Sequence, residues 1–409
     1  MGMIRAVLAV VWWASGGEAH LRVFHPIEVH THSGSIRGEY TRIKGNDFTM
    51  FKGIPYAAPP VGSLRFRPPE EPAKWRGVMN ATQYSAMCVQ RTEGKMSDPD
   101  RRNSHYSEDC LYLNVFAPAL FVNDTYPVIV YIHGGGFQSG GASDLSQQAI
   151  LDNFVSRKIV FVSMNYRLGP LGFLSTDDKE LPGNFGLLDQ ILALKWVQIN
   201  AHEFSGDPNN VLLMGSGSGA ASASILALSP LTQNLFHKLL LMSGTAFTPG
   251  MVRKIAKNAT WALDEKLQCR SYNSSQLLNC FRNQLKDEIL DFPRTRYDDY
   301  DEFVPTVDRE EGVVPELPHL MPLSAYKHPV MIGTTKDESA LKILIMDEKH
   351  INMSALTASE AEFLVDNLTR GYDGFVNHVL IANASKHQYI WTKNDPSYPH
   401  SVLQNSLLK

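Results

Sequence analysis

The chain has 409 residues, and its 44% hydrophobic content is enough to bury a large core as one or two domains. Its formal net charge is only −4 and no basic run is interleaved with aromatic residues, so nucleic acid is not an expected partner. No C-x-x-C spacing occurs among the four cysteines, which disfavours a metal site, and no cofactor is expected.

The first predicted element is a secretory signal. Arg5 precedes the apolar run 6–13, and small residues follow up to Ala19, where cleavage is expected. The apolar run is too short to cross a bilayer. We therefore predict a signal peptide over residues 1–19 and a single domain over 20–409. A first strand or a disordered tail is the alternative for the signal segment.

Cysteines and glycosylation sequons indicate the same compartment. Four cysteines allow three connectivities, and the pairs Cys88–Cys110 and Cys269–Cys280 close the shortest loops; reduced, buried cysteines are the alternative. Seven N-x-S/T sequons lie in polar stretches, at Asn80, Asn123, Asn258, Asn273, Asn352, Asn367 and Asn383. The sequence thus predicts an oxidised, glycosylated protein in the secretory pathway, outside the cell or at its surface.

Apolar runs alternate with helical patterns along the rest of the chain. Buried strands are predicted over 126–135, 158–166, 210–215, 238–244 and 328–335, and helices over 187–204 and from the small residues after 215. Apolar strands separated by helices are typical of a parallel sheet covered on both faces. The more polar stretch 250–325 is predicted to be a helical insertion over the strand ends. The predicted class is therefore α/β.

Two glycine-rich segments directly follow predicted strands, at the sheet edge where chemistry gathers. The segment 133–137, "HGGGF", lets backbone N–H groups approach a ligand and suits an oxyanion hole; a plain glycine turn is the alternative. The segment 215–219, "GSGSG", has the outline of a G-x-S-x-G elbow. Its central residue is Gly217, so no hydroxyl stands at the tip, and Ser216 and Ser218 flank it.

With these segments the chain resembles the type-B carboxylesterase and cholinesterase family. The resemblance rests on "FKGIPYAAPPVGSLRFRPP", "EDCLYLNVFAP", "HGGGF", "NYRLGPLGFLS" and "GNFGLLDQILALKWVQINAHEFSGDPNNV", in the family's order. It implies an α/β-hydrolase fold, with a mostly parallel central sheet and helices on both faces. It also implies the two local disulfides and two structural ion pairs, Arg65–Glu108 and Arg167–Asp189.

The family's catalytic positions map unevenly onto the chain. The oxyanion-hole N–H groups map to Gly135, Gly136 and Ser218, the acid to Glu338, and the nucleophile to Gly217. No histidine after the acid lies in the family's histidine block, so the domain is expected to lack its C-terminal part. Losing a nucleophile or its base typically costs about 10⁶ in rate. The resemblance therefore implies that no residue is catalytically active.

Two functions follow as alternatives. The favoured prediction is a non-catalytic recognition or adhesion protein that resembles neuroligins and gliotactin, with a protein partner at the cell surface and, for a full-length chain, a homodimer. The alternative is a divergent carboxylic ester hydrolase in which Ser218 acts, or a fragment of such an enzyme. A cholinesterase is not expected, because the resemblance implies a choline-binding tryptophan in the loop between Cys88 and Cys110, and that loop contains no tryptophan.

Overall fold

The computed structural model describes residues 25–43, 45–90, 106–118, 124–248, 250–291, 303–308, 311–321 and 327–335. Several predicted features lie outside these residues. They are the signal segment 1–19, the acid position Glu338, and the sequons at Asn123, Asn352, Asn367 and Asn383.

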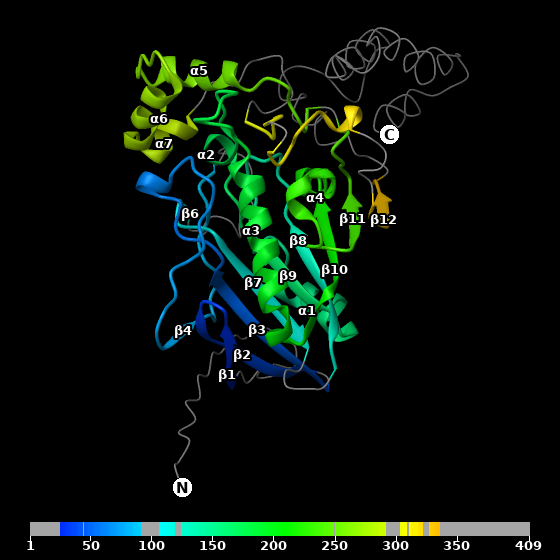
Figure 1. Cartoon of the computed structure of the whole chain (residues 1–409). Helices are drawn as coiled ribbons and strands as arrows, with labels where there is room; N and C mark the ends of the chain where they lie inside the picture. The colour runs from blue at the N-terminus through cyan, green and yellow to red at the C-terminus, as the bar shows by residue number, and fades with distance from the viewer. Residues whose placement is uncertain are drawn as a thin grey trace, which may run out of the picture.

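A mixed sheet runs through the described part of the chain (Figure 1), with its strands in the order β1-β2-β3-β7-β9-β8-β10-β11-β12 and β4 paired to β2 beside that path. The strands are β1 His25–Thr31, β2 Gly34–Ile43, β3 Asn46–Pro55, β4 Val78–Asn80, β7 Tyr112–Pro118, β8 Tyr126–Ile132, β9 Val160–Met164, β10 Gly206–Ser216, β11 Lys238–Met242 and β12 Val330–Gly333. A separate pair consists of β5 Met87–Cys88 and β6 Tyr106–Ser107.

The sheet has two halves of different direction. From β9 to β12 all pairings are parallel, as predicted. From β1 through β3 and β7 to β9 the pairings are antiparallel, and this half was not predicted. All five residues of β9 are buried, as a strand between two layers of helices requires.

The helices cover both faces of the sheet. They are α1 Gln147–Asn153, α2 Gly169–Phe173, α3 Phe185–Asn200, α4 Ser218–Leu228, α5 Lys257–Lys266, α6 Ser274–Asn283 and α7 Lys286–Leu290, with 3₁₀ turns at Gly62–Leu64, Val155–Arg157, Ala201–Phe204, Pro230–Thr232 and Pro318–Leu320. Val130 of β8 packs into the apolar cluster that contains α3 and α4. The next residue, Tyr131, packs into the cluster that contains α1. Because successive strand residues point to opposite faces, these helices lie on opposite sides of the sheet (Figure 1). This arrangement confirms the predicted α/β class.

The predicted helical insertion corresponds to α5, α6 and α7, which gather at one end of the sheet (Figure 1). The disulfide Cys269–Cys280 joins the segment after α5 to α6. The Arg65 guanidinium donates through Nη1 to the carbonyl oxygens of Phe281, at 3.1 Å, and Gln284, at 2.7 Å. The insertion is therefore tied directly to the N-terminal part of the domain.

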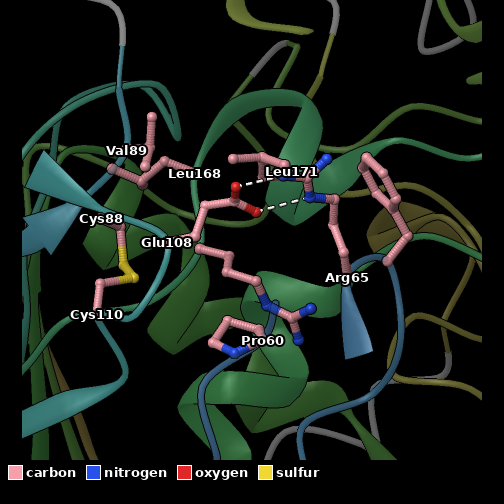
Figure 2. Close-up of a pocket in the computed structure, with 10 residues that line it drawn as sticks. Pro60, Arg65, Cys88, Val89, Glu108, Cys110, Leu168 and Leu171 are labelled. Atoms are coloured by element: carbon pink, nitrogen blue, oxygen red, sulfur yellow. Dashed lines mark hydrogen bonds and ion pairs between the residues drawn. A yellow bond between two sulfur atoms is a disulfide. The ribbon is translucent and has the colours of Figure 1, made fainter. Parts of the chain in front are cut away.

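Both ion pairs implied by the resemblance form in the structure. Arg65 faces Glu108 with two hydrogen bonds of 2.8 and 2.5 Å, beside the disulfide Cys88–Cys110 (Figure 2). Arg167 binds Asp189 in the same bidentate way, at 2.8 and 2.7 Å, and these two side chains are 4% and 0% exposed. The second pair is thus buried in the core that supports the loops above the sheet.

Strand β12 differs from its prediction. It pairs with β11 in parallel, but its apolar residues are exposed: Val330 by 47%, Met331 by 70% and Ile332 by 59%. None of these three side chains belongs to an apolar core cluster of the described residues, so no described helix covers either face of the strand. Apolar composition predicted the strand but not its exposure.

Candidate active site

A tight elbow joins β10 to α4 at the carboxyl edge of the parallel half of the sheet. Gly217, between the two elements, has φ 56° and ψ −121°, a backbone conformation that glycine favours in type II′ turns. Its N–H donates to the carbonyl of Met242 at 2.8 Å, and its carbonyl accepts from Ala221 at 3.0 Å. Within the described residues, no atom lies within 4 Å of the position a Cβ on Gly217 would take. The elbow, residues 216–218, is therefore formed without a side chain at its tip.

A second segment, the glycine loop of residues 133–137, follows β8 at the same edge. Gly135 and Gly136 have φ values of 113° and 66°, and Phe137 also lies in the left-handed region, at 64°. The carbonyl of Gly135 accepts from Gln138 and Ser139, both at 3.0 Å, which closes the loop into a turn. Because β8 and β10 are adjacent parallel strands, the glycine loop and the elbow lie side by side.

The loop and the elbow pack backbone against backbone. A Cβ on Gly134 would lie 2.5 Å from the carbonyl oxygen of Ser216, and one on Gly219 would lie 2.2 Å from the carbonyl oxygen of Ile132. Both distances are shorter than Cβ contacts in real proteins, so glycine is required for this approach. The run of small residues in the sequence thus serves to bring two strand ends together.

Three backbone N–H groups at this junction are suited to bind an oxyanion. Ser218 is the first residue of α4, so its N–H has no helical acceptor. The N–H groups of Gly135 and Gly136, like that of Ser218, donate no hydrogen bond to an acceptor in the part of the chain that the structure describes. N–H groups of this kind stabilise the negative charge that develops in acyl transfer.

The Ser218 hydroxyl lies beneath the glycine loop. Its Oγ accepts the N–H of Phe137 at 3.2 Å, and the Ser218 residue is 4% exposed. The buried Tyr166 hydroxyl donates to the carbonyl oxygen of His133, the first residue of the same loop, at 2.9 Å. The sequence prediction treated Ser218 as an oxyanion donor or an alternative nucleophile and missed its contact with Phe137. Tyr166 was missed as well, although its place just after β9, in the same row of strand ends, was a signal.

Other site types are not supported within the described residues. No cluster of three or more histidine, cysteine or carboxylate side chains that could hold a metal is found there. None of the described helices is long and apolar enough to cross a membrane. The elbow and the glycine loop form the candidate active site because they bring backbone N–H groups to one edge of the sheet.

Comparison with known proteins identifies the kind of domain that carries this site. Residues 25–406 match the carboxylesterase family. The chain is 40% identical over 276 residues to liver carboxylesterase 1F of Rattus norvegicus. The aligned region covers 65% of this chain and 49% of that protein. It is 41% identical over 276 residues to the liver carboxylesterase of Sus scrofa, covering 65% and 48%. It is 38% identical over 333 residues to carboxylesterase 1E of Rattus norvegicus, covering 76% and 58%.

These relatives correct the predicted function. The prediction of a non-catalytic adhesion protein related to neuroligins and gliotactin is wrong, because the relatives at about 40% identity are named as carboxylesterases. That prediction gave one residue, Gly217, more weight than the rest of the domain. The elbow nevertheless keeps its turn, and its backbone N–H groups are retained. The prediction of no enzymatic activity is wrong for the same reason.

The chain spans about half the length of the curated relatives it matches. Its family match, in contrast, extends over nearly all of this chain, from residue 25 to residue 406. The sheet order, the covering helices and the glycine loop beside the elbow agree with that match. The chain belongs to the carboxylesterase family and has its α/β-hydrolase fold.

Proposed function

We propose that this chain is a carboxylic ester hydrolase whose active site is the glycine loop and the elbow. The observation that carries the proposal is the junction of two strand ends, where Gly135, Gly136 and Ser218 offer backbone N–H groups beside the turn at Gly217. The relatives named as carboxylesterases support an ester as the substrate class. The mapping of Gly217 to the nucleophile position and of Glu338 to the acid is part of this proposal.

The proposed reaction is ester hydrolysis by water. The ester carbonyl oxygen binds the three N–H groups, and water attacks the acyl carbon from the side of Gly217. The C–O bond to the alcohol then breaks, and the leaving alkoxide takes the proton that the attacking water loses, which gives one acid and one alcohol. An oxyanion hole and substrate binding alone supply about 10³–10⁴ in rate over water. That acceleration is the expected activity on an activated ester such as p-nitrophenyl butyrate.

Substitution of Gly135 by alanine tests the proposal. A Cβ there would lie 2.0 Å from the backbone oxygen of Ser139, so the glycine loop must shift. Its N–H groups then no longer point toward the ester carbonyl oxygen. Loss of one oxyanion donor costs about 10²–10³ in kcat. We expect Gly135→Ala to bring the hydrolysis of p-nitrophenyl butyrate to within about tenfold of the rate in buffer, measured by p-nitrophenolate release.

Gly77→Ala is the matched control. Gly77 also has a positive φ, 79°, but no described atom lies within 4 Å of its Cβ position. The variant therefore also places a side chain at positive φ, but without a collision, and its activity is expected to equal that of the wild type. Wild-type hydrolysis no faster than in buffer, or equal losses in both variants, would contradict the proposed function.

We also propose that the protein passes through the secretory pathway and is glycosylated. Of the predicted sequons, Asn80, Asn258 and Asn273 lie in the described residues, and all three are exposed. The two disulfides support an oxidising compartment.

Expression in a secreting cell is expected to add N-glycans at these exposed positions. Peptide N-glycosidase F should lower the mass, and each of Asn80→Gln, Asn258→Gln and Asn273→Gln should remove one glycan, as read by mass spectrometry. A secreted chain whose three asparagines carry no glycan would contradict this prediction.

A further inference from the structure

Two buried hydrogen bonds hold the glycine loop at the candidate active site. The N–H of Phe137 donates to Ser218 Oγ at 3.2 Å. The Tyr166 hydroxyl donates to the carbonyl oxygen of His133 at 2.9 Å. All four residues are at most 4% exposed. The two bonds tie the glycine loop to the start of α4 and to the segment after β9.

The two hydrogen bonds lie at the two ends of the glycine loop. His133 is its first residue and Phe137 its last. The His133 ring also stacks on the Tyr166 ring, with centroids 4.4 Å apart and an interplanar angle of 20°. The carbonyl of Phe137 accepts from Gly169 at 2.7 Å. The loop is thus held at both ends while Gly135 and Gly136 lie between them.

We propose that the Ser218 and Tyr166 hydroxyls are positioning groups that clamp the glycine loop against the elbow and so aim the oxyanion-hole N–H groups. This inference rests on the proposed ester hydrolysis for its effect on rate, but the clamp itself does not. Ser218 has two parts with different roles: its backbone N–H is an oxyanion donor, and its side chain holds the loop that supplies the other two donors.

The clamp keeps one hydrogen-bond direction over the working pH range. Burial raises the pKa of Tyr166 well above its ordinary value. The phenol is therefore neutral and can donate to the carbonyl of His133. A clamp of this kind needs no titration to work.

Two substitutions break the clamp at different links. Ser218→Ala removes the acceptor of the Phe137 N–H, and Tyr166→Phe removes the donor to His133 while it keeps the stacked ring. For each variant we expect amide hydrogen exchange in residues 133–137 to rise at least about tenfold. In the same variants kcat for p-nitrophenyl butyrate should fall about tenfold with little change in KM. The reason is that displaced oxyanion-hole N–H groups bind the transition state less tightly.

Ser222→Ala is the matched control. Ser222 lies one turn further along α4, is fully buried, and its Oγ accepts from Gln190 Nε2 at 3.2 Å. Its removal should lower the melting temperature as much as Ser218→Ala does, without raising exchange in the glycine loop. Unchanged exchange in that loop for both clamp variants would overturn the inference. If the wild type hydrolyses no ester, the proposed function fails, and the exchange measurement still decides whether the clamp exists.

Discussion

Replacing Gly217 with cysteine is expected to produce a burst of one equivalent of p-nitrophenolate from p-nitrophenyl butyrate. The Cβ has free space at the tip of the elbow, and the thiol would stand at the N-terminus of the 11-residue helix α4. Helix N-termini lower a cysteine pKa below its usual 8.5 or so and favour the thiolate. The thiolate attacks the acyl carbon, the C–O bond to p-nitrophenolate breaks, and a thioester forms. With the oxyanion donors in place, acylation should be about 10²-fold faster than for a surface thiol.

All four native cysteines form disulfides, so the introduced cysteine is the single free thiol that the ester can acylate. Gly62→Cys provides the matched surface thiol, since Gly62 has φ 58° and no described atom within 4 Å of its Cβ position. Stopped-flow absorbance gives the burst, and peptide mass spectrometry locates the acyl group. Equal acylation rates in the two variants would show that the elbow does not face the oxyanion donors.

Replacing Asp189 with alanine is expected to lower the free energy of unfolding by about 3–5 kcal/mol, the range for breaking a buried ion pair. Asp189 accepts the backbone N–H of Arg167 at 3.0 Å as well as both guanidinium bonds. Its loss leaves a guanidinium in a site that is 4% exposed. Urea unfolding of the whole chain, followed by tryptophan fluorescence, gives the change.

The contrast is Glu28→Ala, which removes the partner of Arg37. That pair is 2.7 Å long, but its side chains are 50% and 44% exposed, so the expected loss is below about 1 kcal/mol. Should Asp189→Ala fail to fold, the double variant Arg167→Met, Asp189→Leu, which leaves no unpaired charge, is expected to fold. Similar losses for Asp189→Ala and Glu28→Ala would refute the assignment of Arg167–Asp189 as a supporting pair.

The parallel half of the fold could be predicted because its strands are continuous apolar runs, as β9 shows with five buried residues. The antiparallel half was harder to find. In β1 and β2 polar residues alternate with few apolar ones, and four residues of β1 and two of β2 are exposed. A strand with one solvent-exposed face shows only an alternation of apolar and polar residues, and this pattern is weak over seven to ten residues.

The candidate site was predictable as far as it depends on backbone. Glycine runs after strands indicated both the loop and the elbow, since few other residues allow such close approach. The clamp was not predictable, because Tyr166 and Ser218 lie far from each other in the chain and each bonds a backbone group of a third segment, the glycine loop. Sequence periodicity does not indicate which backbone group a buried hydroxyl will bind. The functional prediction failed for a different reason: it gave Gly217 more weight than the rest of the domain, which resembles proteins named as carboxylesterases.

The contact of Arg65 with the α6 region has a consequence for synthesis of the chain. Its carbonyl partners lie 216 to 219 positions later, so at about 5–20 residues per second they leave the ribosome roughly 10–40 s after Arg65. Glu108, only 43 positions away, arrives far sooner. During this interval Arg65 and Glu108 can pair while the carbonyl partners are still unmade. The insertion then docks onto a surface in which Arg65 is already paired with Glu108. A chain arrested before residue 281 would leave that surface exposed.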